Sequence, residues 1–349
     1  MIVGGPRQGN TPTIPPGGDS VRNTILTGDS VNAWHNLAVE ALLFESLGER
    51  ERVLYLWQNR DTVVIGRHQN AWKECRVRLL EDEGGTLARR SSGGGAVYHD
   101  LGNLNFSFVL PRSEYDVRRQ LDVVRRAVAE FGIPAQLSGR NDLVIEGSGA
   151  KFSGNAFRFS GEAALHHGTV MVRVALDRLG RYLAPDDGKL KAKGIDSVRA
   201  RVVNLAALNP KITVEALTDA LKRAFVAEYG PARALSEGAL DAARLEALER
   251  EYASWDFRMG KALPFDATLA HRFDWGGVTL EMGLKAGAVA SVQVYSDAMD
   301  EAMVARIAPA LTGARYENRA LGDALRGLGH PQADALAEWL EQTDLGGHQ

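Results

Sequence analysis

Cysteine is almost absent from this sequence: Cys75 is the single one among 349 residues. One cysteine cannot form a disulfide within the chain, and this scarcity fits a reducing compartment. No apolar run approaches the roughly 20 residues that a membrane-spanning helix needs. From these two absences we expect a cytoplasmic protein with no membrane segment.

An excess of charge of one sign is also missing. The 41 Lys and Arg residues nearly balance the 44 Asp and Glu residues, and the formal net charge is −3. We therefore expect no nucleic-acid partner, and any functional positive charge must be local. Residues 1–20 are rich in Gly, Pro and Thr and lack both the apolar core of a signal peptide and the Arg density of a transit peptide. We interpret them as a disordered leader.

The rest of the chain mixes predicted helices and strands, and its length exceeds that of one typical domain. The elements follow no βαβ rhythm, which favours an α+β fold with mainly antiparallel mixed sheets and packed helices. We expect a large domain over 21–255 and a small C-terminal α+β accessory domain over 264–349. Periodicity predicts helices at 34–47, 116–131, 213–229 and 237–254, and strands at 53–57, 62–66, 86–90, 96–99, 104–110, 278–282 and 289–295.

The most informative segment is a loop between two of the predicted strands. It holds two arginines, two serines and three consecutive glycines: Arg89, Arg90, Ser91, Ser92, Gly93, Gly94 and Gly95. Glycines let the backbone approach a ligand closely, and exposed N–H groups, hydroxyls and Arg charges together form an anion site. No Gly-Lys-Ser/Thr and no predicted helix follow, so P-loop and dinucleotide patterns fail. The loop predicts contact with a phosphate; the alternative is a hairpin turn, which needs fewer glycines.

Polar residues gather at two places further along the chain. Asn141 and Asp142 are able to bind a ribose, an amide or the nearby Lys151, whose small neighbours would admit a ligand. As a point charge, Lys151 suits phosphate or carboxylate neutralisation; the alternative is a turn followed by a solvated strand lysine. His166 and His167 are adjacent on a predicted strand, so they face opposite sides and at most one faces a given pocket.

Two further features leave their role open. The segment from Pro185 to Asn204 is polar and bears five basic residues between positions 189 and 201. It is either a solvated loop or a flexible loop that closes over a nucleotide. Cys75 has no partner histidine nearby in the sequence, and we interpret it as a small buried hydrophobe rather than a nucleophile.

Taken together, these segments resemble lipoate–protein ligase A, a family of the biotin and lipoate ligase superfamily. Order and spacing hold from about residue 25 to the C-terminal region, and a run such as Arg89–Val97 is highly specific. The matching stretches are Asn36–Glu40, Asn59–Arg67, Asn70–Cys75, Leu87–Asn103, Ser138–Asp142, Lys151–Gly154, His166–Thr169 and Lys193–Arg201.

The resemblance implies a catalytic domain over 21–255 and a reaction in two steps. Lipoate and ATP form lipoyl-adenylate and pyrophosphate, and the lipoyl group then passes to a lysine of a lipoyl carrier domain. The carriers are a 2-oxoacid dehydrogenase E2 or a glycine-cleavage H protein. The substrate carboxylate is the nucleophile, so the protein supplies charge and positioning. Mg²⁺ is expected with ATP, and no side chain is assigned to a metal.

The resemblance also implies roles for individual residues. Lys151 contacts the lipoyl carboxyl group and the α-phosphate as the catalytic residue, and residues 185–201 resemble an adenylate-capping loop. Supporting contacts are expected from Asn141, Asp142 and His167, and pocket positions for Glu40 and Trp57. The expected adenylate contacts are Arg90, Gly95, Ala96, Val97 and Tyr98, with Arg89, Ser91, Ser92 and Gly93 lining the same loop.

Three alternatives stay open at this stage. A lipoyl- or octanoyltransferase of the same fold would take an acyl group that is already activated. A biotin ligase fits less well, because no Gly-Arg-Gly-Arg-Arg-Gly-like loop is present. A binding protein without catalysis would not need both Arg90 and Lys151.

Overall fold

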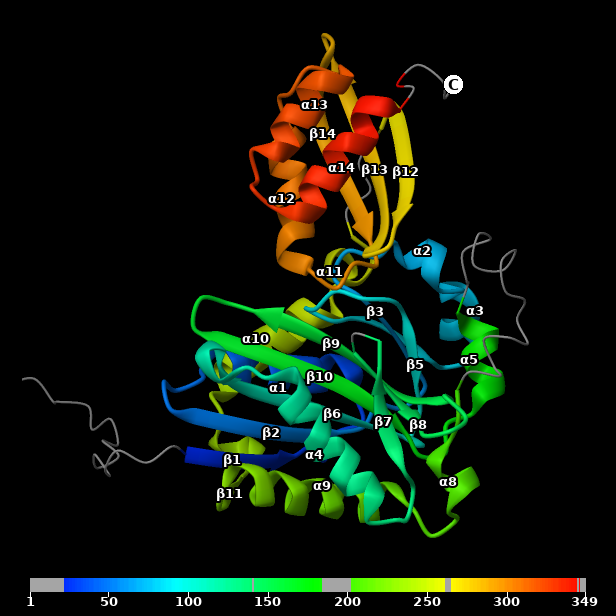
Figure 1. Ribbon diagram of the computed structural model, residues 1–349, viewed down its shortest axis with the longest axis vertical. Coiled ribbons are helices and arrows are strands. Elements are labelled where there is room, and N and C mark those ends of the chain that lie inside the picture. The colour runs from blue at the N-terminus through cyan, green and yellow to red at the C-terminus, as the bar shows by residue number, and fades with distance from the viewer. Residues whose placement is uncertain (1–21, 140, 184–201, 261–264, 344, 346–349) are drawn as a thin grey trace, which may run out of the picture.

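The computed structural model describes residues 22–139, 141–183, 202–260, 265–343 and 345, and shows a larger and a smaller unit stacked along the long axis (Figure 1). The predicted leader over 1–20 and the basic segment over 189–201 lie outside these described residues. Among the described helices, none combines the length and the apolar composition that crossing a bilayer requires.

An eight-stranded mixed sheet forms the centre of the larger unit. β1 is parallel to both of its neighbours, whereas the pairs from β2 through to β7 are antiparallel. The prediction of a mainly antiparallel mixed sheet is therefore confirmed. In spatial order the strands are β11 (Ala232–Leu235), β1 (Arg22–Thr27), β2 (Glu51–Trp57), β6 (Asn103–Pro111), β10 (Ala163–Met171), β9 (Lys151–Phe159), β8 (Asp142–Ile145) and β7 (Ala135–Ser138).

Helices cover both faces of this sheet, because its central strands carry apolar side chains on both sides. Leu54 and Leu56 of β2 pack with α4 (Val117–Ala129) and α9 (Val214–Tyr229) in one core. Val53, Tyr55 and Trp57 alternate with them and pack with α1 (Ala33–Glu45) and α10 (Ala242–Ala253) in a second core. The shorter helices are α2 (Ala71–Glu74), α3 (Val77–Asp82), α5 (Leu176–Tyr182), α8 (Leu205–Leu208) and α11 (Trp255–Met259).

Two of the predicted helices differ in the structure. α1 is buried around its whole circumference rather than along one stripe, because the sheet, α10 and a second small sheet enclose it. The predicted helix 237–254 is a short 3-10 turn at Glu237–Ala239 followed by α10. Asp241 separates the two, since its carboxylate caps α10 by accepting a hydrogen bond from the backbone N–H of Arg244.

A small second sheet carries the glycine-rich loop. It consists of β4 (Thr86–Arg89), β3 (Thr62–Ile65) and β5 (Val97–His99), with β3 in the middle. The loop leaves β4 and enters β5, as the sequence predicts. β3 is parallel to β4 and antiparallel to β5, so the loop crosses over one end of this sheet instead of closing a hairpin.

The smaller unit consists of one layer of strands and one layer of helices, with its own hydrophobic core between them. The edge strand β12 is missing from the prediction because its alternation is weak: of its side chains, only Leu269 is buried. The strands in order are β12 (Ala267–Phe273), β13 (Gly276–Lys285) and β14 (Ala288–Ser296), and they pack against α12 (Glu301–Leu311), α13 (Asn318–Arg326) and α14 (Pro331–Gln342).

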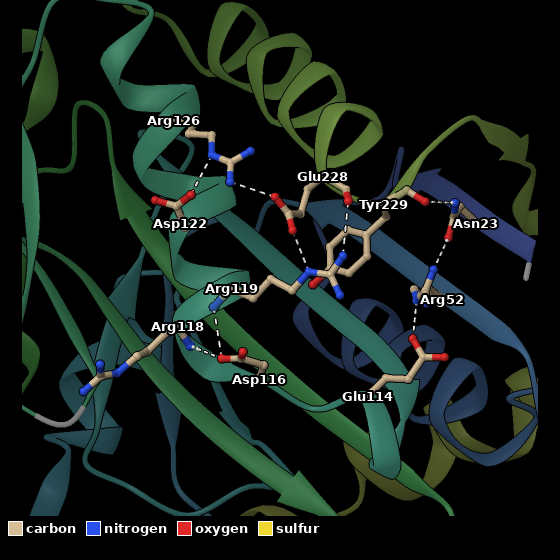
Figure 2. A network of polar contacts seen from close by, with 10 residues as sticks. All are labelled: Asn23, Arg52, Glu114, Asp116, Arg118, Arg119, Asp122, Arg126, Glu228 and Tyr229. Atoms are coloured by element: carbon tan, nitrogen blue, oxygen red, sulfur yellow. Dashed lines mark hydrogen bonds and ion pairs between the residues drawn. The ribbon is translucent and has the colours of Figure 1, made fainter.

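A polar network fastens α4 and α9 to strands β1 and β2 of the main sheet (Figure 2). The Tyr229 ring lies between two guanidinium groups, with the Cζ atom of Arg119 4.5 Å and that of Arg52 5.3 Å from its centroid. Glu228 accepts hydrogen bonds from Arg119 and Arg126, and the Arg119 bond is the main cause that holds the pKa of Glu228 below its usual value. Asn23 of β1 donates to the Tyr229 carbonyl at 2.6 Å, which links both helices to the sheet.

Substitutions at Tyr229 test this arrangement. Burial raises the pKa of Tyr229 to about 12, and its hydroxyl oxygen is buried without a partner among the described groups. Tyr229→Phe should therefore leave the free energy of unfolding unchanged or slightly raise it, because an unsatisfied hydroxyl is removed. Tyr229→Ala should lower it by about 3–5 kcal/mol through lost packing. Urea unfolding measures both, and equal losses in the two variants would contradict the stacked-ring account.

Candidate active site

A cavity of about 200 Å³ lies between the main sheet and the loop side of the small sheet. It contains seven of the predicted ligand-contact residues, together with the predicted pocket residue Trp57. These seven are Arg90, Gly95, Ala96, Val97, Asn141, Lys151 and His167. Residues from six strands, helix α1 and three loops thus meet around one cavity, although the outermost of them, Leu37 and Met299, are 262 positions apart in the sequence.

Arg90 organises the glycine-rich loop from inside. Its Nη2 donates to the carbonyls of Gly93 at 2.7 Å and Gly95 at 2.8 Å, and its Nε donates to the Ser92 hydroxyl at 3.1 Å. Burial lowers the pKa of Arg90 to about 10, so the guanidinium stays charged near neutral pH. Nη1 makes only a long contact of 3.3 Å to Val64 and is the part of the group best able to bind a ligand.

The other predicted loop residues do not line this cavity. Arg89 donates to backbone carbonyls of residues 66–69 and of α11, and thereby fixes the neighbouring loop. The Tyr98 hydroxyl donates to Asp61 at 2.9 Å. Ser91, Ser92 and Gly93 are packed behind the cavity wall. In the described structure these residues contact protein groups that hold the loop in shape, and ligand contact through them stays a prediction.

Lys151 begins β9 at the open end of the cavity. Its Nζ lies 2.8 Å from Oδ1 of Asp142, and its side chain is 39 % exposed. The backbone positions it further, because the carbonyl of Lys151 accepts a hydrogen bond from the N–H of Val203 at 2.9 Å. Of the alternatives foreseen for Asp142, the structure shows the contact with the lysine, and Asp142 itself does not line the cavity. A charged ligand at this end would meet a cation that is already in contact with Asp142.

A buried carboxylate, that of Glu40, joins two walls of the cavity. Its Oε1 lies 2.8 Å from Nδ1 of His167 and accepts a hydrogen bond from the Ser107 hydroxyl at 2.5 Å. On the far side of the imidazole, Nε2 of His167 lies 2.6 Å from the Ser92 hydroxyl. Ser107 in turn accepts from Nε1 of Trp57 at 3.0 Å. One carboxylate therefore positions a wall residue on the sheet and the serine beneath the glycine-rich loop.

The two adjacent histidines face opposite sides of the sheet, as predicted from the strand period. His167 lines the cavity, whereas His166 lies within the α4 core, 2.8 Å from Gln120 and 3.0 Å from Oδ1 of Asn155. The interpretation of Cys75 is also confirmed. Its thiol is buried away from the cavity, and burial raises its pKa to about 12.

Some cavity residues are missing from the prediction. Met299 comes from the smaller unit, 130 residues beyond Thr169, the nearest other wall residue in the sequence, and no local pattern marks it. Its segment is held in place because the Ala298 carbonyl accepts a hydrogen bond from the N–H of Gly94 at 2.9 Å. Asn105 and His99 could have been found from the sequence, because each is a polar residue on a strand that the sequence predicts. Gly94 belongs to the predicted phosphate loop but had no contact of its own assigned. The other cavity residues without a predicted role are Leu37, Val64, Gly154, Asn155, Ala156, Gly168 and Thr169.

The fold and the cavity define a class of proteins in which a glycine-rich loop and a strand lysine face a pocket on a mixed sheet. Residues 32–226 match the family described as the lipoyl protein ligase A/B catalytic domain. Residues 262–342 match the bacterial lipoate protein ligase C-terminus. The chain belongs to the lipoyl protein ligase A/B family, which confirms the resemblance found in the sequence.

Solved structures agree with this family. LipL1 of P. falciparum, in complex with lipoate, has a TM-score of 0.81 and 26% identity and covers 92% of this chain and 100% of its own. The bi-partite lipoate protein ligase of Thermoplasma acidophilum, described with its E2 lipoyl domain, has a TM-score of 0.60 and 28% identity, covering 70% and 98%. A lipoate-protein ligase A bound with ATP has a TM-score of 0.57 and 26% identity, covering 69% and 99%. The predicted α+β fold is confirmed.

The buried histidines give a prediction for the pH dependence of stability. Burial lowers the pKa of both His99 and His166 to about 3, whereas an unfolded histidine titrates near 6.5. Their contribution is complete above pH 6.5 and is lost as the pH falls toward 3. Each should remove on the order of 2 kcal/mol of unfolding free energy between about pH 7.5 and 5. His166→Gln should flatten this dependence, measured by denaturant unfolding at several pH values.

His35 offers a control of opposite sign. Burial lowers the pKa of His35. The carboxylates of Glu249 at 2.9 Å and Glu237 at 3.0 Å together raise it by more than burial lowers it, so the net shift is upward. A raised folded pKa stabilises the protein at low pH, and this contribution is lost as the pH rises. His35→Gln should therefore make the loss of stability in acid steeper. If His166→Gln and His35→Gln changed the pH dependence of stability in the same direction, the opposite signs assigned to these two histidines would be contradicted.

Proposed function

We propose that the protein is an ATP-dependent lipoate–protein ligase. The observation that supports this most directly is the pair of cations, Arg90 and Lys151, on the wall of one cavity that the apolar side chains of Leu37 and Trp57 also line. An acid with a medium-length hydrocarbon chain matches this polarity, with its carboxylate at the cations. The lipoate-bound and ATP-bound relatives support the same pair of substrates.

In the proposed first step, a lipoate carboxylate oxygen attacks the α-phosphorus of ATP. A new P–O bond forms, the bond to the β-phosphate oxygen breaks, and pyrophosphate leaves. Lys151 and Nη1 of Arg90 would stabilise the negative charge that develops on the α-phosphate oxygens, from fixed positions and with little reorganisation. The loop N–H groups at Gly95 and Ala96 would add hydrogen bonds.

In the second step, the amine of an acceptor lysine attacks the lipoyl carbonyl, AMP leaves and the amine loses a proton. The protein needs no nucleophile of its own, in agreement with the buried position of Cys75. We propose lipoyl carrier domains as acceptors, as the E2 lipoyl domain described with the archaeal relative suggests. The proposal includes a cytoplasmic location and a division of the chain into a catalytic domain over 21–255 and an accessory domain over 264–349.

Mg²⁺ is expected to accompany ATP, bound through the phosphates. Among the described residues, no group of three His, Cys, Asp or Glu side chains could hold a metal ion, so we assign no protein ligand to it. No step of the proposal depends on such a ligand.

Lys151→Ala tests the proposed chemistry. We expect lipoate-dependent release of pyrophosphate from ATP to fall at least about 100-fold, the scale of one lost electrostatic stabiliser. Lys222→Ala is the matched control, because Lys222 pairs with Asp219 on α9, away from the cavity. Near-normal rates in Lys151→Ala would refute the role of this lysine. If the wild-type protein released no pyrophosphate but moved octanoyl or lipoyl groups from a pre-activated donor, the transferase alternative would replace the ligase.

A further inference from the structure

Two deeply buried side chains present polar atoms without a partner at the cavity. Asn105 is 1% exposed and His99 is 4% exposed, and both line the cavity. Nδ2 of Asn105 and Nε2 of His99 have no hydrogen-bond partner among the described protein groups. Buried polar atoms nearly always have a partner, so two such atoms at one cavity point to a ligand that supplies it.

The surrounding hydrogen bonds show that both atoms are donors. Oδ1 of Asn105 already accepts from Asn103 at 2.9 Å, which leaves its amide N–H groups free. Nδ1 of His99 lies 3.1 Å from Nδ2 of Asn59, an amide donor, so this ring nitrogen accepts. The orientation of the Asn59 amide follows from Asn36, whose Nδ2 donates to Oδ1 of Asn59 at 3.0 Å and to the Gln58 carbonyl at 2.8 Å. Since burial keeps His99 neutral, its proton is on Nε2.

Both donor residues lie beside Trp57, a deeply buried wall residue of the cavity. Asn105 is the register partner of Trp57 on the neighbouring strand, and the His99 ring makes an edge contact with Trp57 at 6.5 Å between centroids. Trp57 is 3% exposed, whereas the Lys151 side chain is 39% exposed. This step rests on the proposed function: an acid whose carboxylate lies at Lys151 extends its chain toward Asn105 and His99.

We infer that Asn105 and His99 form a selectivity filter that favours acids whose hydrocarbon chain carries a hydrogen-bond acceptor near its far end. The disulfide sulfurs of lipoate are weak acceptors of this kind. An unsubstituted chain such as that of octanoate fills the space and leaves two buried donors without a partner. A site built around hydrogen bonds discriminates against a ligand that lacks the matching group, because the loss of the protein's own bonds is not compensated.

Direct binding of acids to the full-length protein tests the filter without requiring catalysis. The probes are lipoate, octanoate and 6-thiaoctanoate, a thioether acid of the same chain length, each titrated by calorimetry. We expect the wild-type protein to bind lipoate and 6-thiaoctanoate about tenfold or more tightly than octanoate. Equal affinity for all three acids would overturn the inference, whatever the variants do.

Asn105→Leu removes one donor at similar volume. It should narrow the preference for lipoate over octanoate to within about threefold, chiefly by tighter octanoate binding. Asn209→Leu is the control, because this amide donates to the Phe131 carbonyl away from the cavity; it should leave the ratio unchanged. Weaker binding of every acid at a constant ratio would overturn the filter. Selective binding without pyrophosphate release would overturn the ligase proposal alone, so the two failures are distinguishable.

Discussion

The buried carboxylate of Glu40 is the interaction on which the site depends. Two hydrogen-bond chains meet at its Oε1, one through Ser107 to Trp57 and one through His167 to Ser92 and the guanidinium of Arg90. The directions of these bonds are mutually consistent: every donor has an acceptor, and each chain ends on the negative charge. Replacing this carboxylate would leave several buried polar groups unsatisfied at once, which is why such networks hold a site rigid.

A second chain connects the open end of the cavity to the opposite face of the sheet. Gln120 of α4 lies against His166, which lies against Asn155, and Asn155 donates to the carbonyl of Asn141 at 2.6 Å. Asn141 is a cavity residue, whereas Gln120 and His166 belong to the core on the other face. The orientation of the loop before β8 is thus set through the sheet. The two adjacent histidines thus belong to different hydrogen-bond chains: His166 to the chain from Gln120 to Asn141, and His167 to the chain that ends at Glu40.

Local sequence patterns predicted those features of the molecule that depend only on residues close together in the sequence. Strand period placed His166 and His167 on opposite faces, and the glycine run placed a loop between β4 and β5. The same patterns missed β12, whose exposed side chains do not alternate, and broke down at Asp241, where a helix cap interrupts an apolar repeat. Met299 could not be predicted from periodicity at all, because its place at the cavity follows from a contact between two units. The identity of Arg90 was evident, but its use of loop carbonyls as partners was not.

The structure also explains why the loop needs three glycines where a hairpin would need fewer. A Cβ atom at Gly93 would lie 2.2 Å from the Ala298 carbonyl oxygen, so this position is required by the approach of the smaller unit. Gly94 has a φ of 89°, which side chains rarely adopt. Gly95 has ordinary geometry, and a Cβ atom there would meet no described atom within 4 Å. Gly93 and Gly94 therefore serve the fold. Gly94 and Gly95 both line the cavity, but of the three glycines only Gly95 has open space at its Cβ position, next to the Arg90 bond that holds its carbonyl. We therefore propose that the phosphate contact predicted for the whole run is made at Gly95, where no protein atom occupies the space that a ligand would need.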